Sequence, residues 1–114
     1  MTDFTREELE KLSEISRKAL GSNLAGIDLS QANLHGAFLF RANLRGANLR
    51  GANLRGAYLC EANLNWADLR GADLRGAKLG GASILANLRG AIYNKLTKFP
   101  EGFDPETVWM LLAE

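Results

Sequence analysis

A leucine at every fifth position constrains the fold of this chain more than any other feature. Leucine recurs from residue 24 to residue 79 without a break, and Ile84 takes the next place, so that thirteen repeat centres follow one another. In an α-helix, a step of five residues turns the side chain by about 140°, which would spread the leucines around the whole circumference. Eight glycines stand two residues after a centre, and each would cost a helix about 1 kcal/mol relative to alanine. The repeat therefore excludes a helix in the middle of the chain.

An extended chain that turns a corner once per repeat satisfies the same pattern. Side chains alternate between the two faces of an extended chain, so the alanine two residues before each centre points to the same side as the leucine. The residues directly before and after the centre point the other way, and most are Asn, Asp, Arg, Ser or His. Because five is odd, the chain must bend in each repeat, and glycine permits the backbone angles of a corner. We therefore predict a coiled solenoid with leucine inside.

Two interruptions of the repeat indicate how many sides make one coil. The segments GAFLFR and GAYLCE depart from the common motif at the same three places, twenty residues apart. Because four repeats span twenty residues, a four-sided coil places Phe38 on Tyr58 at a coil spacing of about 4.8 Å. It also brings Arg41 beside Glu61. A three-sided coil would instead stack Phe38 on Asn53 and leave the coincidence unexplained.

The tandem motif resembles that of a known family. Repeats of the form A(N/D)LRG, such as ANLRG at 42–46 and ADLRG at 67–71, are similar to those of pentapeptide repeat proteins, and the similarity covers about 74 residues. The resemblance implies an all-β solenoid, folded as a right-handed quadrilateral parallel β-helix. Thirteen centres, together with Leu88 and Tyr93 beyond them, correspond at four per coil to roughly 3.5–4 coils.

The pattern divides the chain into three segments. Residues 1–21 are expected to form an N-terminal α-helical cap, and residues 22–95 the pentapeptide-repeat β-helix. A register slip is expected near 85–86, where the spacing between centres falls from five residues to four. Residues 96–114 are expected to form a C-terminal turn and a short helical cap. Caps are needed because an open solenoid exposes unpaired backbone groups at both ends.

Both caps have recognisable start signals. Thr5 and Glu8 form a capping box for the N-terminal helix. Asp104 followed by Pro105 is typical of a helix start near the C-terminus. The apolar residues that follow this second start are Val108, Trp109, Leu111 and Leu112.

Composition places the chain in a broad class. A length of 114 residues fits one domain, and the net charge of +1 points to neither nucleic acid nor membrane. The single cysteine, Cys60, can form neither an internal disulfide nor a cysteine metal cluster, which fits a reducing compartment. The first residues, MTDFTREELEKL, contain no apolar run of the signal-peptide type. We therefore expect a soluble, cytoplasmic protein.

Arginines form columns on the outside of the expected coil. Residues 22–95 hold nine basic and four acidic residues, a net of +5. Stacking by twenty places Asn and Asp beside the arginines, and asparagines can hydrogen-bond along such a stack. Basic columns would bind phosphate groups with a steep dependence on salt. The candidate basic faces consist of Arg45, Arg50, Arg55, Arg70 and Arg75.

The fourth side of the coil has apolar side chains in place of polar ones. We take Phe38, Phe40, Tyr58 and Cys60 as a candidate interaction face, because an aromatic stripe on the outside of a small protein is usually covered. Three covers remain open at this point: the chain's own tail near Phe99, a second copy of the chain, or another partner.

The sequence contains no motif for catalysis or for binding a small ligand. It has no His/Cys cluster, no nucleophile with a base at motif spacing and no phosphate-binding loop. A packed leucine interior also leaves no pocket for a substrate. We therefore expect no enzyme activity, no cofactor, no metal, no membrane contact and no small-molecule substrate.

Two functions remain. The first is a non-catalytic scaffold or protein–protein interaction module, whose partner is a second copy or another protein. The alternative is a protein that binds nucleic acid or interacts with DNA gyrase, as some members of the similar family do. Mimicry of DNA is disfavoured, because it needs an acidic surface and the repeat faces here are basic.

Overall fold

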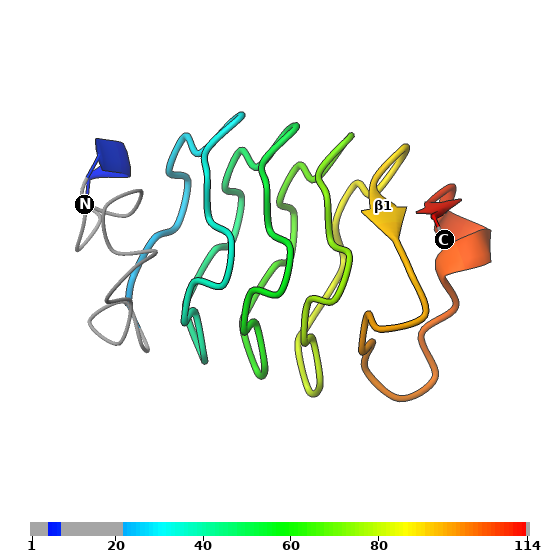
Figure 1. Cartoon of the computed structure of the whole chain (residues 1–114). Helices are drawn as coiled ribbons and strands as arrows, with labels where there is room; N and C mark the ends of the chain where they lie inside the picture. The colour runs from blue at the N-terminus through cyan, green and yellow to red at the C-terminus, as the bar shows by residue number, and fades with distance from the viewer. Residues whose placement is uncertain (1–4, 8–21, 114) are drawn as a thin grey trace.

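The chain winds into a stack of similar coils (Figure 1). The computed structural model describes residues 5–7 and 22–113. The regular elements are β-strand β1, Ile92–Tyr93, in the last coil, and after it 3-10 helix η2, Pro105–Val108, and β-strand β2, Leu111–Leu112. The predicted N-terminal cap lies outside the described residues except for residues 5–7, of which Arg6 and Glu7 are helical.

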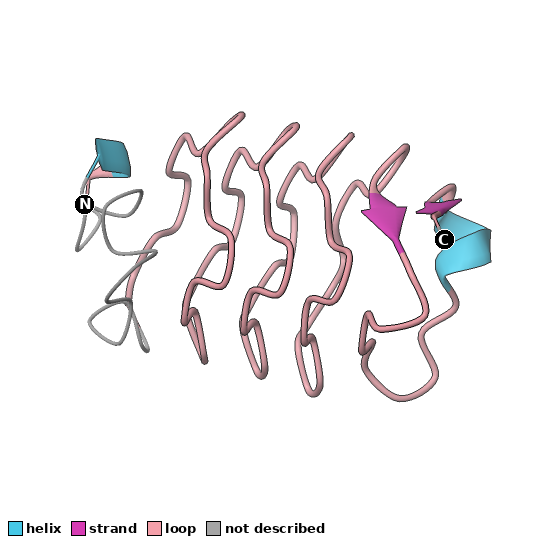
Figure 2. Cartoon of the chain, in the orientation of Figure 1, coloured by secondary structure: helices cyan, strands magenta, loops and turns pink. Residues whose placement is uncertain are grey.

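Each coil has four sides. The first four bridges pair residues twenty apart in parallel, and successive bridges start five residues apart: Asn23 with Asn43, Asp28 with Asn48, Asn33 with Asn53, and Phe38 with Tyr58. We name the sides after these first residues: the Asn23, Asp28, Asn33 and Phe38 sides. Each side makes only one bridge per coil, which is why Figure 2 draws the coils as loop rather than strand.

Three backbone hydrogen bonds join each side to the next coil. The Leu24 N–H donates to the Asn43 carbonyl at 2.7 Å, and the Asn43 N–H donates back to the Ser22 carbonyl at 2.8 Å. The N–H of the corner residue Gly26 donates to the Arg45 carbonyl at 2.8 Å. The same set recurs with the five-residue period, so the coil satisfies most of its backbone polar groups through its neighbours.

Every corner from residue 26 to residue 81 has a left-handed backbone. Gly56 has φ of 67°, and the non-glycine corner residues Gln31, Arg41, Glu61 and Trp66 have φ between 57° and 65°. Glycine adopts this conformation without a steric penalty, whereas the other residues do not. The glycine of the motif is therefore explained by the corner.

The interior consists of stacked leucines and alanines. Leu54 and the other central leucines are completely buried, and the alanines two residues earlier lie beside them with little or no exposure. Burial of one leucine side chain stabilises the fold by roughly 1.5–3 kcal/mol before the entropy of ordering its repeat is subtracted.

The register of the coils changes once and then recovers. Asn63 pairs with Ser83, twenty residues on, but Asp68 pairs with Asn87, nineteen residues on. The spacing stays at nineteen at Asp73 and returns to twenty where Lys78 pairs with Lys98. One residue is thus lost between 83 and 87 and one is regained between 92 and 98.

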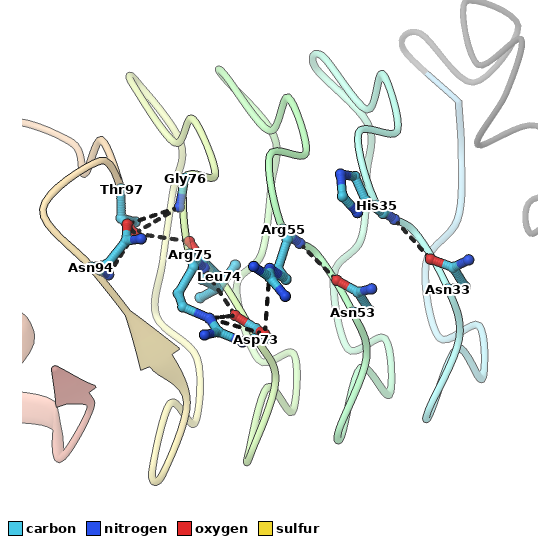
Figure 3. A network of polar contacts seen from close by, with 10 residues as sticks. All are labelled: Asn33, His35, Asn53, Arg55, Asp73, Leu74, Arg75, Gly76, Asn94 and Thr97. Carbon is cyan, nitrogen blue, oxygen red and sulfur yellow. Dashed lines mark hydrogen bonds and ion pairs between the residues drawn. The ribbon is translucent and has the colours of Figure 1, made fainter. Parts of the chain in front are cut away.

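Side chains replace a backbone bond where the register recovers (Figure 3). In the preceding coil, the Gly56 N–H donates to the Arg75 carbonyl at 3.0 Å. The equivalent N–H of Gly76 donates instead to Asn94 Oδ1 at 3.1 Å and to Thr97 Oγ1 at 3.3 Å. The buried Thr97 hydroxyl in turn donates to the Leu74 carbonyl at 2.9 Å. The extra residue is therefore accommodated without an unpaired corner.

The C-terminal segment closes the stack with a strand as well as a helical turn. Asp104 Oδ1 accepts from the Glu106 N–H at 2.9 Å and caps η2, as the sequence predicts. The turn ends at Trp109, whose φ is 64°. Leu111 and Leu112, which the sequence places after a helix start, form β2 and pair in parallel with β1. The last coil leaves a backbone edge free, and the N–H groups of Leu111 and Ala113 donate to the Ala91 and Tyr93 carbonyls of this edge at 2.8 Å.

Candidate interaction surface

On three sides of the coil, the residue before each leucine caps its own repeat. Asn53 Oδ1 accepts from the Arg55 N–H at 3.1 Å, and Asn48 Oδ1 accepts from the Arg50 N–H at 3.1 Å. This N–H takes no part in the bonds between coils, so the Asn or Asp side chain supplies its acceptor. Bonding along the stack is weaker: Asn43 Nδ2 lies 3.4 Å from Asn23 Oδ1.

The Phe38 side replaces these caps with aromatic rings. The ring centroids of Phe38 and Tyr58 are 4.7 Å apart, as the twenty-residue spacing predicts. Phe40 stacks on Tyr58 at 5.5 Å and lies 6.1 Å from Phe38. All three are half-buried by one another and by the coil. We call Phe38, Phe40 and Tyr58 the aromatic stripe.

Polar groups border the aromatic stripe. The Lys78 ammonium lies 4.8 Å from the centroid of Tyr58 and donates to the Gly76 carbonyl at 3.1 Å. Arg41 Nε and Glu61 Oε1 form the expected ion pair at 2.7 Å. Cys60 is a half-buried free thiol whose Sγ lies 3.7 Å from the Lys78 carbonyl, and it lines a shallow hollow together with Phe40.

The C-terminal tail contributes no ring to the aromatic stripe. Phe99 lies 5.6 Å from Tyr93 and 4.9 Å from Phe103, so these three residues form a separate cluster against the core. Within residues 22–113, the ring contacts of the stripe come from its own members and from Lys78.

The arginines of the candidate basic faces lie on the other three sides. Arg45 is exposed on the Asn23 side, while Arg50 and Arg70 share one column and Arg55 and Arg75 the next. Two carboxylates lie within these columns. Asp68 lies 2.6 Å from Arg70 Nη2 and 3.9 Å from Arg50 Nε. Asp73 lies 2.6 Å from Arg75 Nη2 and 3.9 Å from Arg55 Nε.

These contacts change the pKa of both carboxyl groups. Hydrogen bonds from the Arg70 side chain hold the pKa of Asp68 below its ordinary value. Partial burial acts to raise the pKa of Asp73, but the hydrogen bonds from Arg75 and the charge of Arg55 outweigh it and the pKa is lowered. Both carboxylates are therefore charged at neutral pH and offset part of the positive charge of the columns.

A shallow hollow runs along the corner between the Asn33 side and the Phe38 side. It reaches across the coils that Figure 3 shows around Arg55, Arg75 and Gly76. We call it the basic groove, since its charged or titratable lining residues are His35, Arg55, Arg75, Lys78 and Lys98. Lys78 belongs both to this groove and to the border of the aromatic stripe.

Comparison with known proteins identifies the repeat. The profile of pentapeptide repeats matches residues 20–51 and 39–76, with eight copies. The chain belongs to the pentapeptide repeat family. A pentapeptide repeat protein from Nostoc Pcc 7120 is similar in structure, with a TM-score of 0.64 and 36% identity over 96% of each chain. Together with the four-sided coil, this similarity gives the fold as a right-handed β-helix solenoid.

Two further pentapeptide repeat structures are similar over part of their length. One, from the thylakoid lumen of Arabidopsis thaliana, is 29% identical over 74% of this chain and 71% of that chain, with a TM-score of 0.49. The other, Rfr23 from the cyanobacterium Cyanothece 51142, is 41% identical over 68% of this chain and 56% of that chain, with a TM-score of 0.44. A comparison with curated proteins gives no match.

The twenty-residue period places Lys78 on the Phe38 side of this pentapeptide repeat protein, but sequence reasoning missed Lys98. Lys78 occupies the Asn/Asp position twenty residues after Tyr58, and Lys98 follows it after a further twenty. The twenty-residue period also leads from Lys78 to Lys98, but the register change between them concealed the pairing. Asn94 and Leu96, which also follow the register change, line the same groove.

The described part of the chain shows no metal-binding group and no membrane span. Among residues 5–7 and 22–113, no group of three or more His, Cys, Asp or Glu residues could hold a metal ion. None of the helices in the same residues is long and apolar enough to cross a membrane.

Proposed function

We propose that this pentapeptide repeat protein is a non-catalytic scaffold or protein–protein interaction module whose contact surface is the aromatic stripe. One observation supports the proposal above the others. On the Phe38 side, the repeat gives up the Asn or Asp that caps the other three sides and places two rings in contact there instead. A local hydrogen bond is lost by this exchange, and an apolar surface is gained.

The aromatic stripe has the properties of a contact surface. Aromatic residues are enriched at protein interfaces, where they dominate the binding free energy. Phe38, Phe40 and Tyr58 already hold one another in place, so a partner would not have to order them. Their centroids lie within 6.1 Å of one another, which makes one continuous patch rather than scattered residues.

The test is the double variant Phe38→Asn with Tyr58→Asn. Asparagine is the residue of the repeat at this position and would restore the cap on the following N–H, so the coil should remain folded. We expect self-association in sedimentation, or capture of a specific protein from host extract, to be lost. The matched control is Asn43→Ser with Asn63→Ser, which has the same spacing on the Asn23 side. Equal behaviour of the wild type and the double variant in both assays would rule the proposal out.

A second candidate, nucleic-acid binding, rests on the arginine columns. Arg45 and Arg50 are exposed and form part of these columns, but Asp68 and Asp73 hold Arg70 and Arg75 in ion pairs. Retention of the protein on DNA or RNA at low salt, with a steep loss as salt rises, would support this candidate. If the protein passes through a DNA or RNA column without retention at low salt, and leaves gyrase supercoiling unchanged, nucleic-acid binding is excluded.

A further inference from the structure

Two lysines are stacked in the basic groove without a carboxylate between them. Lys78 and Lys98 are bridge partners on adjacent coils, so their side chains leave the backbone only about 4.8 Å apart. Like charges that leave adjacent coils at the same place disfavour each other. Neither lysine forms an ion pair with any residue in the described ranges. Two positive residues kept on adjacent coils of one column are explained if the groove holds an anionic group from outside.

The rest of the groove has the same sign of charge. Arg55 and Arg75 line it together with the lysines, and Asp73 is the carboxylate that contacts both arginines. Four positive charges against one negative charge leave a local net of +3, not counting His35. Charge of one sign in a hollow attracts a ligand of the opposite sign and speeds its association.

The groove and the aromatic stripe form one continuous surface. Lys78 lines the groove, and its ammonium also lies 4.8 Å from the centroid of Tyr58. A ligand that places a carboxylate on Lys78 therefore brings its neighbouring groups onto the rings. The surface requires a ligand with negative charge and apolar side chains close together.

We propose that the partner presents an acidic segment, in which Asp or Glu residues lie beside apolar ones, and that this segment binds across the groove and the aromatic stripe. The inference rests on the proposed function and names the chemistry of the partner. The carboxylates would lie between Lys78, Lys98 and Arg55, and the apolar side chains would contact the ring edges of Phe40 and Tyr58.

The ring geometry favours a peptide over a nucleic acid. Nucleobases bind to aromatic side chains by stacking on an open ring face. Here Tyr58 is covered by Phe38 at 4.7 Å, by Phe40 at 5.5 Å and by the Lys78 ammonium at 4.8 Å. Apolar side chains can pack on any exposed part of the rings, and Phe38, Phe40 and Tyr58 are each only half-buried.

The test uses the full chain and three fluorescein-labelled probes. The first is a short peptide of Glu, Phe and Leu, the second is the same peptide with Gln for each Glu, and the third is single-stranded oligothymidylate of equal charge. The groove variant is Lys98→Glu, which should fold because it replaces a repulsion with an attraction to Lys78. The matched control is Arg45→Glu, an exposed cation on the Asn23 side.

The acidic peptide should bind the wild type, and its Kd should rise by about fivefold or more with Lys98→Glu and stay nearly constant with Arg45→Glu. The Gln peptide and the oligonucleotide should bind more weakly. No binding of the acidic peptide, equal binding of the Gln peptide, or tighter binding of the oligonucleotide would overturn the inference.

The failure of this inference can be told apart from the failure of the proposed function. If Phe38→Asn with Tyr58→Asn abolishes partner capture while Lys98→Glu leaves both capture and peptide binding intact, the proposed function stands and the acidic segment is wrong. If the double variant changes neither capture nor peptide binding, the stripe is not the contact surface and both are wrong.

Discussion

A single corner residue fixes the direction of the chain in every repeat. Gly56 and Trp66 adopt nearly the same backbone conformation, with φ of 67° and 65°. A residue with a side chain in this region costs roughly 1–2 kcal/mol more than glycine does. The corners that lack glycine therefore store conformational strain, which the bonds between coils hold in place.

Substitutions at these two corners should have opposite effects. A methyl group added to Gly56 would have no atom within 4 Å, so Gly56→Ala changes only the backbone preference. We expect it to lower the free energy of unfolding by about 1 kcal/mol, and Trp66→Gly to raise it by a smaller amount. Urea denaturation measures both. A neutral Gly56→Ala would mean that the corner does not need the left-handed conformation.

The Asn before each leucine should stabilise its own repeat rather than the stack. Asn53→Ala removes the acceptor of the Arg55 N–H and should cost roughly 0.5–1.5 kcal/mol. Asn53→Asp keeps an acceptor oxygen there and should cost less, because Asp68 and Asp73 already fill equivalent positions. Chemical denaturation of the two variants tests this order, and the reverse order would favour bonding between stacked asparagines.

On the scale of one side of a coil, the buried leucine provides most of the stability. Leu54 is fully buried in a central coil, whereas Leu96 is 59% exposed. We expect Leu54→Ala to lower the free energy of unfolding by about 2–5 kcal/mol, and Leu96→Ala to change it little. The measurement is the urea midpoint together with the slope. A similar small loss at both positions would contradict a packed leucine interior.

The Asp–Arg pairs should make stability depend on pH in the acid range. The folded-state pKa values of Asp68 and Asp73 lie below their ordinary values, so these carboxylates stabilise the fold above an unfolded pKa of about 3.9. That contribution is lost as the pH falls from about 4 through the folded pKa, and because the pairs are partly exposed it should be about 1 kcal/mol or less each.

The variant Asp73→Asn should flatten this acid dependence. Unfolding by urea at pH 7 and at pH 3 gives the difference for the wild type and for the variant. Asn keeps the acceptor for the Arg75 N–H, so the variant isolates the charge. An unchanged difference between the two pH values would show that Asp73 has no shifted pKa in the folded state.

The sequence predicts the position of each residue on one side of the coil well, because that position depends on the repeat alone. The positions of Leu54, Phe38 and Tyr58 follow from the period and the alternation of side chains alone. The role of Asn53 as a cap could not be predicted, because it depends on which backbone N–H the bonds between coils leave free.

Prediction fails where the period is broken. The deletion between residues 83 and 87 was visible in the spacing, but its reversal by Asn94 and Thr97 was not, since it depends on side chains that reach the Gly76 N–H in the preceding coil. The contacts of Phe99 with Tyr93 and Phe103, and the strand β2, also lie beyond the first break of the period. The basic groove was therefore found only in three dimensions.

On the scale of the whole molecule, stacking joins single departures from the repeat motif into continuous surfaces. Two breaks of the motif twenty residues apart make one aromatic stripe, and two lysines at the next steps of the same column make one edge of the basic groove. A short stack therefore presents different chemistry on each side, although its sides share one backbone.

The stacking of residues twenty apart underlies every surface described above. Nuclear Overhauser contacts in the labelled wild-type protein test it most directly. A four-sided coil predicts strong contacts between the ring protons of Phe38 and Tyr58, whose centroids are 4.7 Å apart. Contacts of Phe38 with Asn53 in their place would show a three-sided coil and contradict the assignment of the aromatic stripe and of the basic groove.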